Sequence, residues 1–180
     1  MNFKVSNVEH YVSPPGLKVD EILHTYGTSL DNMKKVIKDA VFVHRNLTKE
    51  FQIELAEQLK SVFEKHFQDM GMQLYGIGYS PTRRLTPDVE VGQKGRQKRI
   101  FIEIEFRPDG EYKDIVKFQI GYKKQTLELG ILIAAMNKET MKVINKKYSP
   151  IYEKCIQTIE ELQSDCPILV MGIEGGWIPA

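Results

Sequence analysis

Hydrophobic and polar positions follow two spacings along this chain, and together they predict an alternation of strands and helices. Apolar residues recur every three or four positions over residues 48–71, which predicts a long helix with Thr48 as N-cap and Gly71 just past its end. Residues 99–106 alternate strictly, which predicts a half-buried strand. The expected elements, in chain order, are a strand at 2–12, helices at 30–40 and 48–71, strands at 73–79, 88–92 and 99–106, a helix at 111–124, a strand at 127–135, a loop at 136–140, a helix at 150–163 capped by Ser149, and a strand at 166–172.

This order of elements predicts an α/β fold. A helix, three strands, a helix and a further strand follow one another, which is typical of a sandwich with a mixed sheet flanked by helices. The chain has 180 residues, of which 42% are hydrophobic, so it is long enough to bury one proper core. We therefore expect a single domain over residues 1–180.

Three carboxylates come together if residues 93–97 form the turn of a hairpin. Glu103 and Glu105 lie two positions apart and so share one face of their strand, where two like charges repel each other and attract a cation. In an antiparallel hairpin the numbers of paired residues have a constant sum. Pairing Asp88 with Glu103 gives a sum of 191, which centres the turn between Gly95 and Arg96. One fold-back then brings Asp88 beside Glu103 and Glu105.

A carboxylate set of this kind predicts a site for Mg²⁺, which is commonly held by one or two carboxylates together with substrate phosphates. We expect Asp88 and Glu103 to bind one or two metal ions, with the backbone carbonyl of Ile104 as a further ligand. Glu105 would be a ligand or would accept the proton of an attacking water. Glu57 or Glu64 of the long helix could add another acidic side chain.

Basic residues flank these carboxylates, although the net charge is only +1. A concave basic stripe beside a metal site suits a polyanionic substrate. The candidate phosphate contacts are Arg83, Arg84, Lys94, Arg96, Lys98 and Arg99.

These residues resemble a known nuclease site. Pro87-Asp88 followed by Glu103-Ile104-Glu105 is similar to the PD-(D/E)XK site, in the variant where a Glu replaces the usual Lys, as in the BamHI restriction endonuclease. Residues 101–106, 112–122 and 127–133 resemble restriction enzymes of the BglII/BstYI kind, which have a strand with two acidic or amide residues, a helix with Lys-Phe-Gln, and a further strand. The resemblance covers about residues 85–140. Two departures, residues 107–110 and Glu128, bear on sequence specificity more than on chemistry.

The resemblance implies a restriction-endonuclease-like fold and a type II enzyme that hydrolyses double-stranded DNA with Mg²⁺. Asp88, Glu103 and Glu105 would be its catalytic residues, and Asn137 and Lys138 its candidates for base recognition. Relatives of this kind cut palindromes built around GATC, and a palindrome implies a two-fold homodimer.

Three other functions stay open from the sequence. One is a different PD-(D/E)XK nuclease, acting in repair or on DNA structure. Another is a catalytically inactive DNA-binding protein with this fold. A metal-dependent enzyme for a small phosphorylated substrate is less favoured, because the sequence has no glycine-rich phosphate loop.

Cellular location follows from composition. No apolar run approaches the roughly 20 residues that span a membrane, and the first residues lack the apolar stretch of a signal peptide. Only two cysteines are present, Cys155 and Cys166, which favours a reducing compartment. We expect a cytoplasmic protein without membrane partners.

Overall fold

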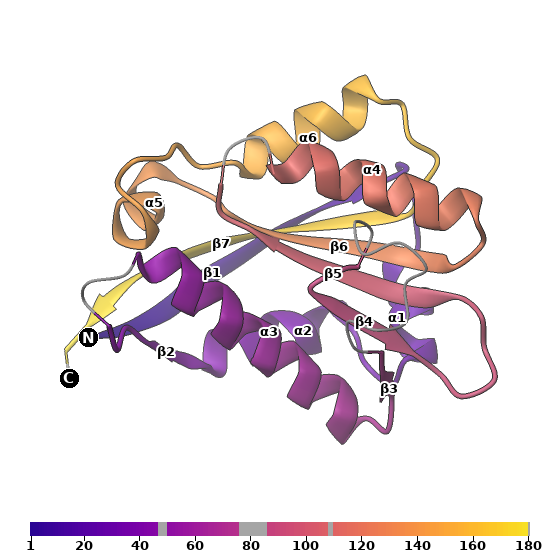
Figure 1. Ribbon diagram of the computed structural model, residues 1–180, viewed down its shortest axis with the longest axis horizontal. Coiled ribbons are helices and arrows are strands. Elements are labelled where there is room, and N and C mark those ends of the chain that lie inside the picture. The colour runs from indigo at the N-terminus through magenta and orange to yellow at the C-terminus, as the bar shows by residue number, and fades with distance from the viewer. Residues whose placement is uncertain (47–49, 76–85, 108–109, 180) are drawn as a thin grey trace.

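The protein is described here by a computed structural model that covers residues 1–46, 50–75, 86–107 and 110–179. Within these residues the strands form one seven-stranded mixed sheet in the order β2-β1-β7-β6-β5-β4-β3 (Figure 1). The strands are β1 (Asn2–Ser13), β2 (Val41–Val43), β3 (Gln73–Leu74), β4 (Val89–Gly92), β5 (Arg99–Glu105), β6 (Leu127–Ala135) and β7 (Ile168–Ile178). The helices are α1 (Val19–Thr25), α2 (Leu30–Asp39), α3 (Phe51–Asp69), α4 (Gly110–Lys123), α5 (Lys138–Ile144) and α6 (Tyr152–Glu161).

The central strands are parallel and the outer ones antiparallel. β6 pairs in parallel with β5 and β7, whereas β4 pairs antiparallel with β5, and β1 antiparallel with β7. β6 is buried along nearly its whole length, which explains its almost uninterrupted apolar sequence. This arrangement confirms the predicted α/β fold with a mixed sheet flanked by helices.

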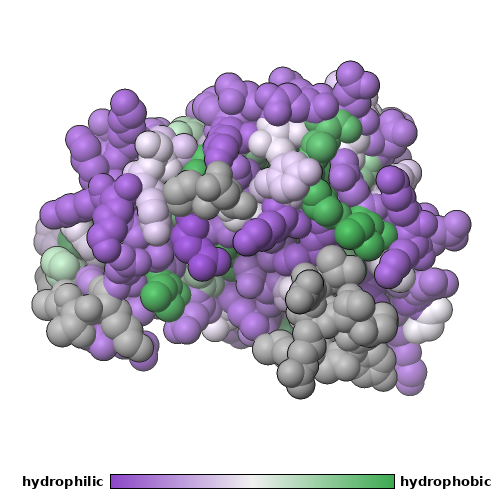
Figure 2. Space-filling view, turned by 45° about the horizontal axis from the view of Figure 1, so that its top comes forward, coloured by the Kyte–Doolittle hydropathy of each residue, from purple (hydrophilic) through white to green (hydrophobic). Residues whose placement is uncertain are grey.

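Helices cover both faces of the sheet (Figure 1). The face shown in Figure 2 is mostly hydrophilic, with a few apolar side chains between the polar ones. The core under α1, α2 and α3 includes Leu55 and Phe63, and the core under α4 and α6 includes Phe118 and Ile159. α4 lies close to the sheet because β6 carries Gly130 beneath it: an added Cβ there would lie 2.5 Å from Cδ2 of Phe118. α3 and α4 lie over opposite faces of β5, because Ile102 of this strand belongs to the first core and Phe101 to the second.

Several element boundaries differ from the predictions. α3 begins at Phe51 with Glu50 as N-cap, and Thr48 lies outside the described residues. The expected loop at 136–140 is wrong over residues 138–140, because α5 begins at Lys138 with Asn137 as its N-cap. α6 begins at Tyr152 with Ile151 as N-cap, so Ser149 does not cap it.

The strands and short elements also differ. The strand expected at 73–79 is confined to Gln73–Leu74 as far as the structure describes it. β7 continues to Ile178, beyond the expected end at 172, because β1 supplies a pairing partner over that whole length. α1 and β2 were not expected, since both are too short for a spacing pattern to stand out. No helix in the described ranges is long and apolar enough to cross a membrane.

Candidate active site

The predicted hairpin forms in the predicted register. Val89 pairs with Ile102 and Val91 with Ile100, and each pair of numbers adds to 191. The same register, continued by one residue, places Asp88 opposite Glu103. In the turn, the Arg96 amide donates to the carbonyl of Gln93 over 3.1 Å, and Gly95 takes a φ of 84° that favours glycine.

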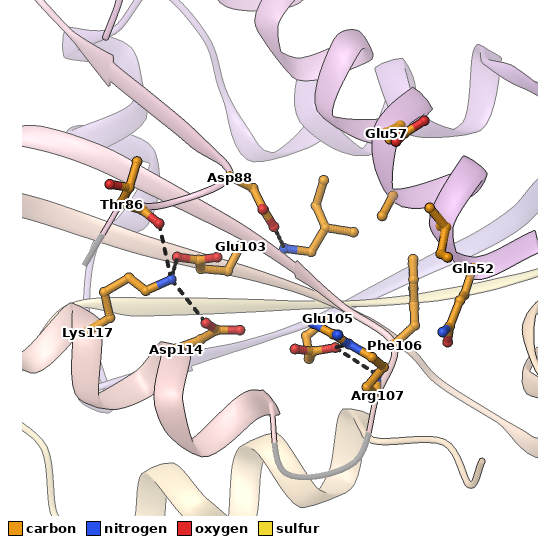
Figure 3. Close-up of a pocket in the computed structure, with 13 residues that line it drawn as sticks. Gln52, Glu57, Thr86, Asp88, Glu103, Glu105, Phe106, Arg107, Asp114 and Lys117 are labelled. Carbon is orange, nitrogen blue, oxygen red and sulfur yellow. Dashed lines mark hydrogen bonds and ion pairs between the residues drawn. The ribbon is translucent and has the colours of Figure 1, made fainter. Parts of the chain in front are cut away.

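The three predicted carboxylates, Asp88, Glu103 and Glu105, line one cavity of about 460 Å³ (Figure 3). α3 contributes one wall, which includes Gln52 and Glu57, and α4 contributes Asp114 and Lys117 from the other side. The remaining lining residues are Ile53, Ala56, Thr86, Ile104, Phe106 and Arg107.

Asp88 is fixed by the backbone of the neighbouring strand. Its Oδ2 accepts a hydrogen bond of 2.8 Å from the amide of Ile104, the residue between the two glutamates (Figure 3). This contact holds the Asp88 carboxylate beside β5 although Asp88 itself precedes β4. The strand register brings Asp88 near Glu103, and this hydrogen bond then fixes the position of the Asp88 carboxylate.

Glu103 is the most deeply buried of the three, with 4% of its surface exposed. Its Oε1 accepts from the ammonium of Lys117, which also donates to Asp114 Oδ1 at 3.2 Å and to the carbonyl of Thr86 at 3.4 Å. Burial raises the pKa of Glu103 to about 9, assisted by the charges of Asp114 and Asp88, although Lys117 acts in the opposite direction. Burial also raises the pKa of Asp114 to about 6.

Glu105 points to a different part of the cavity. Its Oε1 accepts from the Arg107 amide at 2.7 Å (Figure 3). Its Oε2 lies against Gly110, the first residue of α4. A Cβ at position 110 would lie 1.8 Å from that oxygen, so only glycine leaves room for the carboxylate. The N-terminus of a helix stabilises a negative charge, which suits this placement.

The donor chemistry of the cavity fits a divalent metal, although the described residues contain no cluster of three His, Cys, Asp or Glu side chains that could hold an ion as they stand. Mg²⁺ needs only one or two carboxylates when water and phosphate complete its shell. Asp88 and Glu103 meet that need. Burial is the main cause of the raised pKa of Glu103, and the nearby carboxylates of Asp114 and Asp88 add to it. Acidic residues also outnumber cationic ones among the described residues that line the cavity, and a divalent cation would offset both effects.

The predicted basic turn lies at the other end of β5 from Glu105 (Figure 1). Arg96 approaches Glu128 to 3.4 Å, and the Tyr26 hydroxyl donates to the same carboxylate. Arg99 pairs with Glu90 and lies over the ring of Tyr75, 3.6 Å from its centroid. Two other cations of this turn, Lys94 and Lys98, are exposed.

The other predicted DNA contacts have different surroundings. Arg83 and Arg84 lie outside the described residues. The side chain of Asn137 caps α5 by accepting from the Thr140 amide at 2.8 Å, and it also donates to Glu174. Lys138, the first residue of α5, is exposed.

Sequence reasoning missed Asp114 and Lys117. Both lie in the helix that carries Lys-Phe-Gln, and their spacing of three residues places them on one face of it. A search for acidic residues alone could not have selected a lysine. Glu57 lines the cavity as one of the two candidates on α3, while Glu64 lines a smaller neighbouring one.

An α/β sandwich with carboxylates from adjacent strands beside a cavity is the architecture expected of a nuclease. The sequence matches the family described as "Restriction endonuclease BglII/BglIII" over residues 18–173, and the chain therefore belongs to this family. Its members are deoxyribonucleases that hydrolyse phosphodiester bonds, which confirms the predicted enzyme class.

Solved structures show the same fold. Free BglII is 12% identical with a TM-score of 0.52, and the match covers 96% of this chain and 82% of that one. BglII complexed with a DNA 16-mer is 13% identical with a TM-score of 0.58, and the match covers 96% and 80%. A comparison with curated protein sequences found no significant match.

Proposed function

We propose that this chain is a Mg²⁺-dependent type II restriction endonuclease that cleaves double-stranded DNA at a palindromic site. The observation that carries this proposal is the convergence of Asp88, just before β4, and Glu103, on the adjacent strand β5, on one cavity. Membership of the restriction endonuclease family and the fold shared with a DNA-bound BglII structure support it.

In this proposal Asp88 and Glu103 hold the metal, with the carbonyl of Ile104 as a further ligand. Bound there, a divalent ion would lower the pKa of a water it holds and would stabilise charge on the phosphate. The hydrogen bond from the Ile104 amide keeps the Asp88 carboxylate oriented toward this position. Glu105, held beside Gly110, either adds a ligand or accepts the proton of the attacking water.

The DNA contacts belong to the same proposal. A two-fold homodimer would present two such sites to a palindrome, and a GATC-containing site is the first candidate. Exposed Lys94, Lys98 and Lys138, together with Arg83 and Arg84, are proposed to contact DNA. Because Arg96, Arg99 and Asn137 already have partners within the chain, their proposed contribution is to shape the surface.

Digestion of plasmid and phage DNA with the purified protein and Mg²⁺ tests the proposal. Discrete fragments that disappear when EDTA replaces Mg²⁺ are expected, and mapping their ends gives the site. A smear would favour a structure-specific or nonspecific nuclease instead. Binding without any nicking would favour an inactive DNA-binding protein.

Oligomeric state is measured separately, because cleavage alone does not report it. Sedimentation of the protein is measured with and without a DNA fragment that contains one intact cleavage site. The protein in the complex should be a dimer. A monomer that cuts both strands in independent steps would contradict the two-fold arrangement.

A further inference from the structure

The Lys-Phe-Gln segment of α4 brings a lysine into the candidate active site from outside the strands. Lys117 is 12% exposed in its side chain, and its ammonium bonds to Glu103, Asp114 and the Thr86 carbonyl (Figure 3). All three partners are acceptors, so the ammonium donates to each of them. A buried lysine with this environment is held in one place rather than moving freely in solvent.

Charge around the cavity is unbalanced. Among the described residues that line it, five are acidic and only two, Arg107 and Lys117, are cationic. Arg107 is 66% exposed and interacts with Glu105. Lys117 is therefore the cation that faces Asp88, Glu103 and Asp114 in the interior part of the cavity.

Because position 105 is occupied by a glutamate, β5 itself supplies no positive charge to the cavity beside Glu103. The strand that carries Glu103 has a second glutamate where a lysine would have supplied positive charge from the same strand. α4 supplies it instead, from the turn of helix that lies over β5 and β6. Asp114, one turn earlier, and the Thr86 carbonyl hold the ammonium there.

The position of the ammonium has a consequence for metal binding. Its bond to Glu103 uses a carboxylate oxygen of a residue that the proposed function assigns to the metal. Two cations near one carboxylate repel each other, strongly so where water is excluded. If Glu103 binds the metal instead, Asp114 and the Thr86 carbonyl remain as acceptors for the Lys117 ammonium.

We propose that Lys117 competes with the divalent metal for Glu103, so that the DNA-free enzyme binds metal weakly and loads it together with DNA phosphates. This inference rests on the proposed function and adds a positioning residue to it. DNA favours loading in this scheme because its phosphate oxygens supply further metal ligands. By linkage, the metal must then favour DNA binding by the same factor.

Titration calorimetry with Ca²⁺, at mildly alkaline pH and without DNA, tests the competition. Lys117→Met is expected to bind Ca²⁺ roughly tenfold more tightly than the unaltered protein, because one repelling charge is gone. Lys117→Arg keeps the charge and should stay close to the unaltered affinity. Lys113→Met, which removes an exposed lysine from the same helix, is the matched control and should change nothing.

A purely structural role predicts the opposite sign. If Lys117 only held the site together, Lys117→Met would bind Ca²⁺ more weakly, and that result, or an unchanged affinity, overturns the inference. Thermal unfolding identifies a variant that fails to fold, in which case Lys117→Gln is measured in its place. The titration is repeated in the presence of a DNA fragment that contains an intact cleavage site. DNA should raise the Ca²⁺ affinity of Lys117→Met less than that of the unaltered protein.

The outcomes separate this inference from the proposed function. If the unaltered protein neither binds Ca²⁺ nor cuts DNA with Mg²⁺, the proposed function fails. If it does both but Lys117→Met does not bind Ca²⁺ more tightly, only the competition fails.

Discussion

The two ends of β5 differ in the sign of their charges and in how far those charges are paired. The end near Glu105 is acidic and incompletely paired, whereas the end at the turn is basic and its arginines are paired. At the end near Glu105, carboxylates outnumber the cations around them, and burial together with the charges of Asp114 and Asp88 raises the pKa of Glu103 to about 9. At the other end, Arg96 and Arg99 each lie against a carboxylate of a neighbouring strand. Charge left unbalanced marks a place for a ligand, whereas charge balanced within the chain stabilises the fold.

The strongest test removes the carboxylates from the unbalanced end. Asp88→Asn or Glu103→Gln should lower the cleavage rate by about a thousandfold or more, because the proposed metal loses a charged ligand. Cleavage is measured with saturating Mg²⁺, and DNA affinity by gel shift should stay close to that of the unaltered protein. Cleavage that continues at the normal rate in either variant would exclude that residue from the mechanism.

The balanced end should respond in stability rather than in chemistry. Arg99→Ala leaves Glu90, which is buried, without its ion pair and removes the cation from the Tyr75 ring. We expect a loss of about 2–3 kcal/mol in the free energy of unfolding, measured in urea. Lys98→Ala, an exposed neighbour, is the control and should lose less than about 0.5 kcal/mol.

Gly110 provides a geometric test of the unbalanced end. Gly110→Ala places a methyl group where Glu105 Oε2 now lies, so the carboxylate must move. If Glu105 acts from this position, cleavage should fall by about tenfold to a hundredfold, which corresponds to about 1.4–2.7 kcal/mol in the barrier. Gly176→Ala meets no atom within 4 Å and serves as the control.

The pH dependence of stability reports the burial of Glu103 and Asp114. Because the pKa of Glu103 is raised in the folded state, the folded protein binds this proton more tightly than the unfolded chain, and stability falls as pH rises from about 5 toward 9. The pKa of Asp114, about 6, acts in the same direction at lower pH. In EDTA the melting temperature should drop by at least about 2 °C over this window.

Two comparisons attribute that drop to the site. Glu103→Gln should flatten the pH dependence, since it removes the titrating group. Adding Ca²⁺ at the alkaline end should restore the melting temperature. A melting temperature that rises with pH in EDTA would contradict the raised pKa of Glu103.

The smallest expected effect concerns the exposed lysines of the turn. Lys94→Ala and Lys98→Ala should each weaken DNA binding a few-fold, equally for all sequences, and reduce the salt dependence of binding by about one ion. Filter binding at several salt concentrations measures both quantities. An unchanged salt dependence would remove the turn from the proposed DNA surface.

The sequence predicted the hairpin and its carboxylates because both depend on local rules. Strand alternation places Glu103 and Glu105 on one face, and a glycine turn fixes the register that brings Asp88 beside them. The same reasoning predicted the mixed sheet, since β6 is an apolar run that follows a helix.

What the sequence did not reveal depends on contacts between distant segments. Lys117 acquires its place only when α4 packs over β5, and Arg96 acquires Glu128 only when β6 lies beside the hairpin. In sequence, every basic residue of the run 94–99 therefore looked free to contact DNA, although both of its arginines interact with carboxylates of the fold. The N-capping role of Asn137 was hidden because residues 136–140 were assigned to a loop.

Four of the charged residues at the unbalanced end, Glu103, Glu105, Asp114 and Lys117, lie within one stretch of fifteen residues, 103–117. A single exchange of genetic material can therefore transfer the acidic group and its lysine together. This short segment therefore sets the charge balance of the site within a fold shared with BglII, to which the chain is only 12–13% identical.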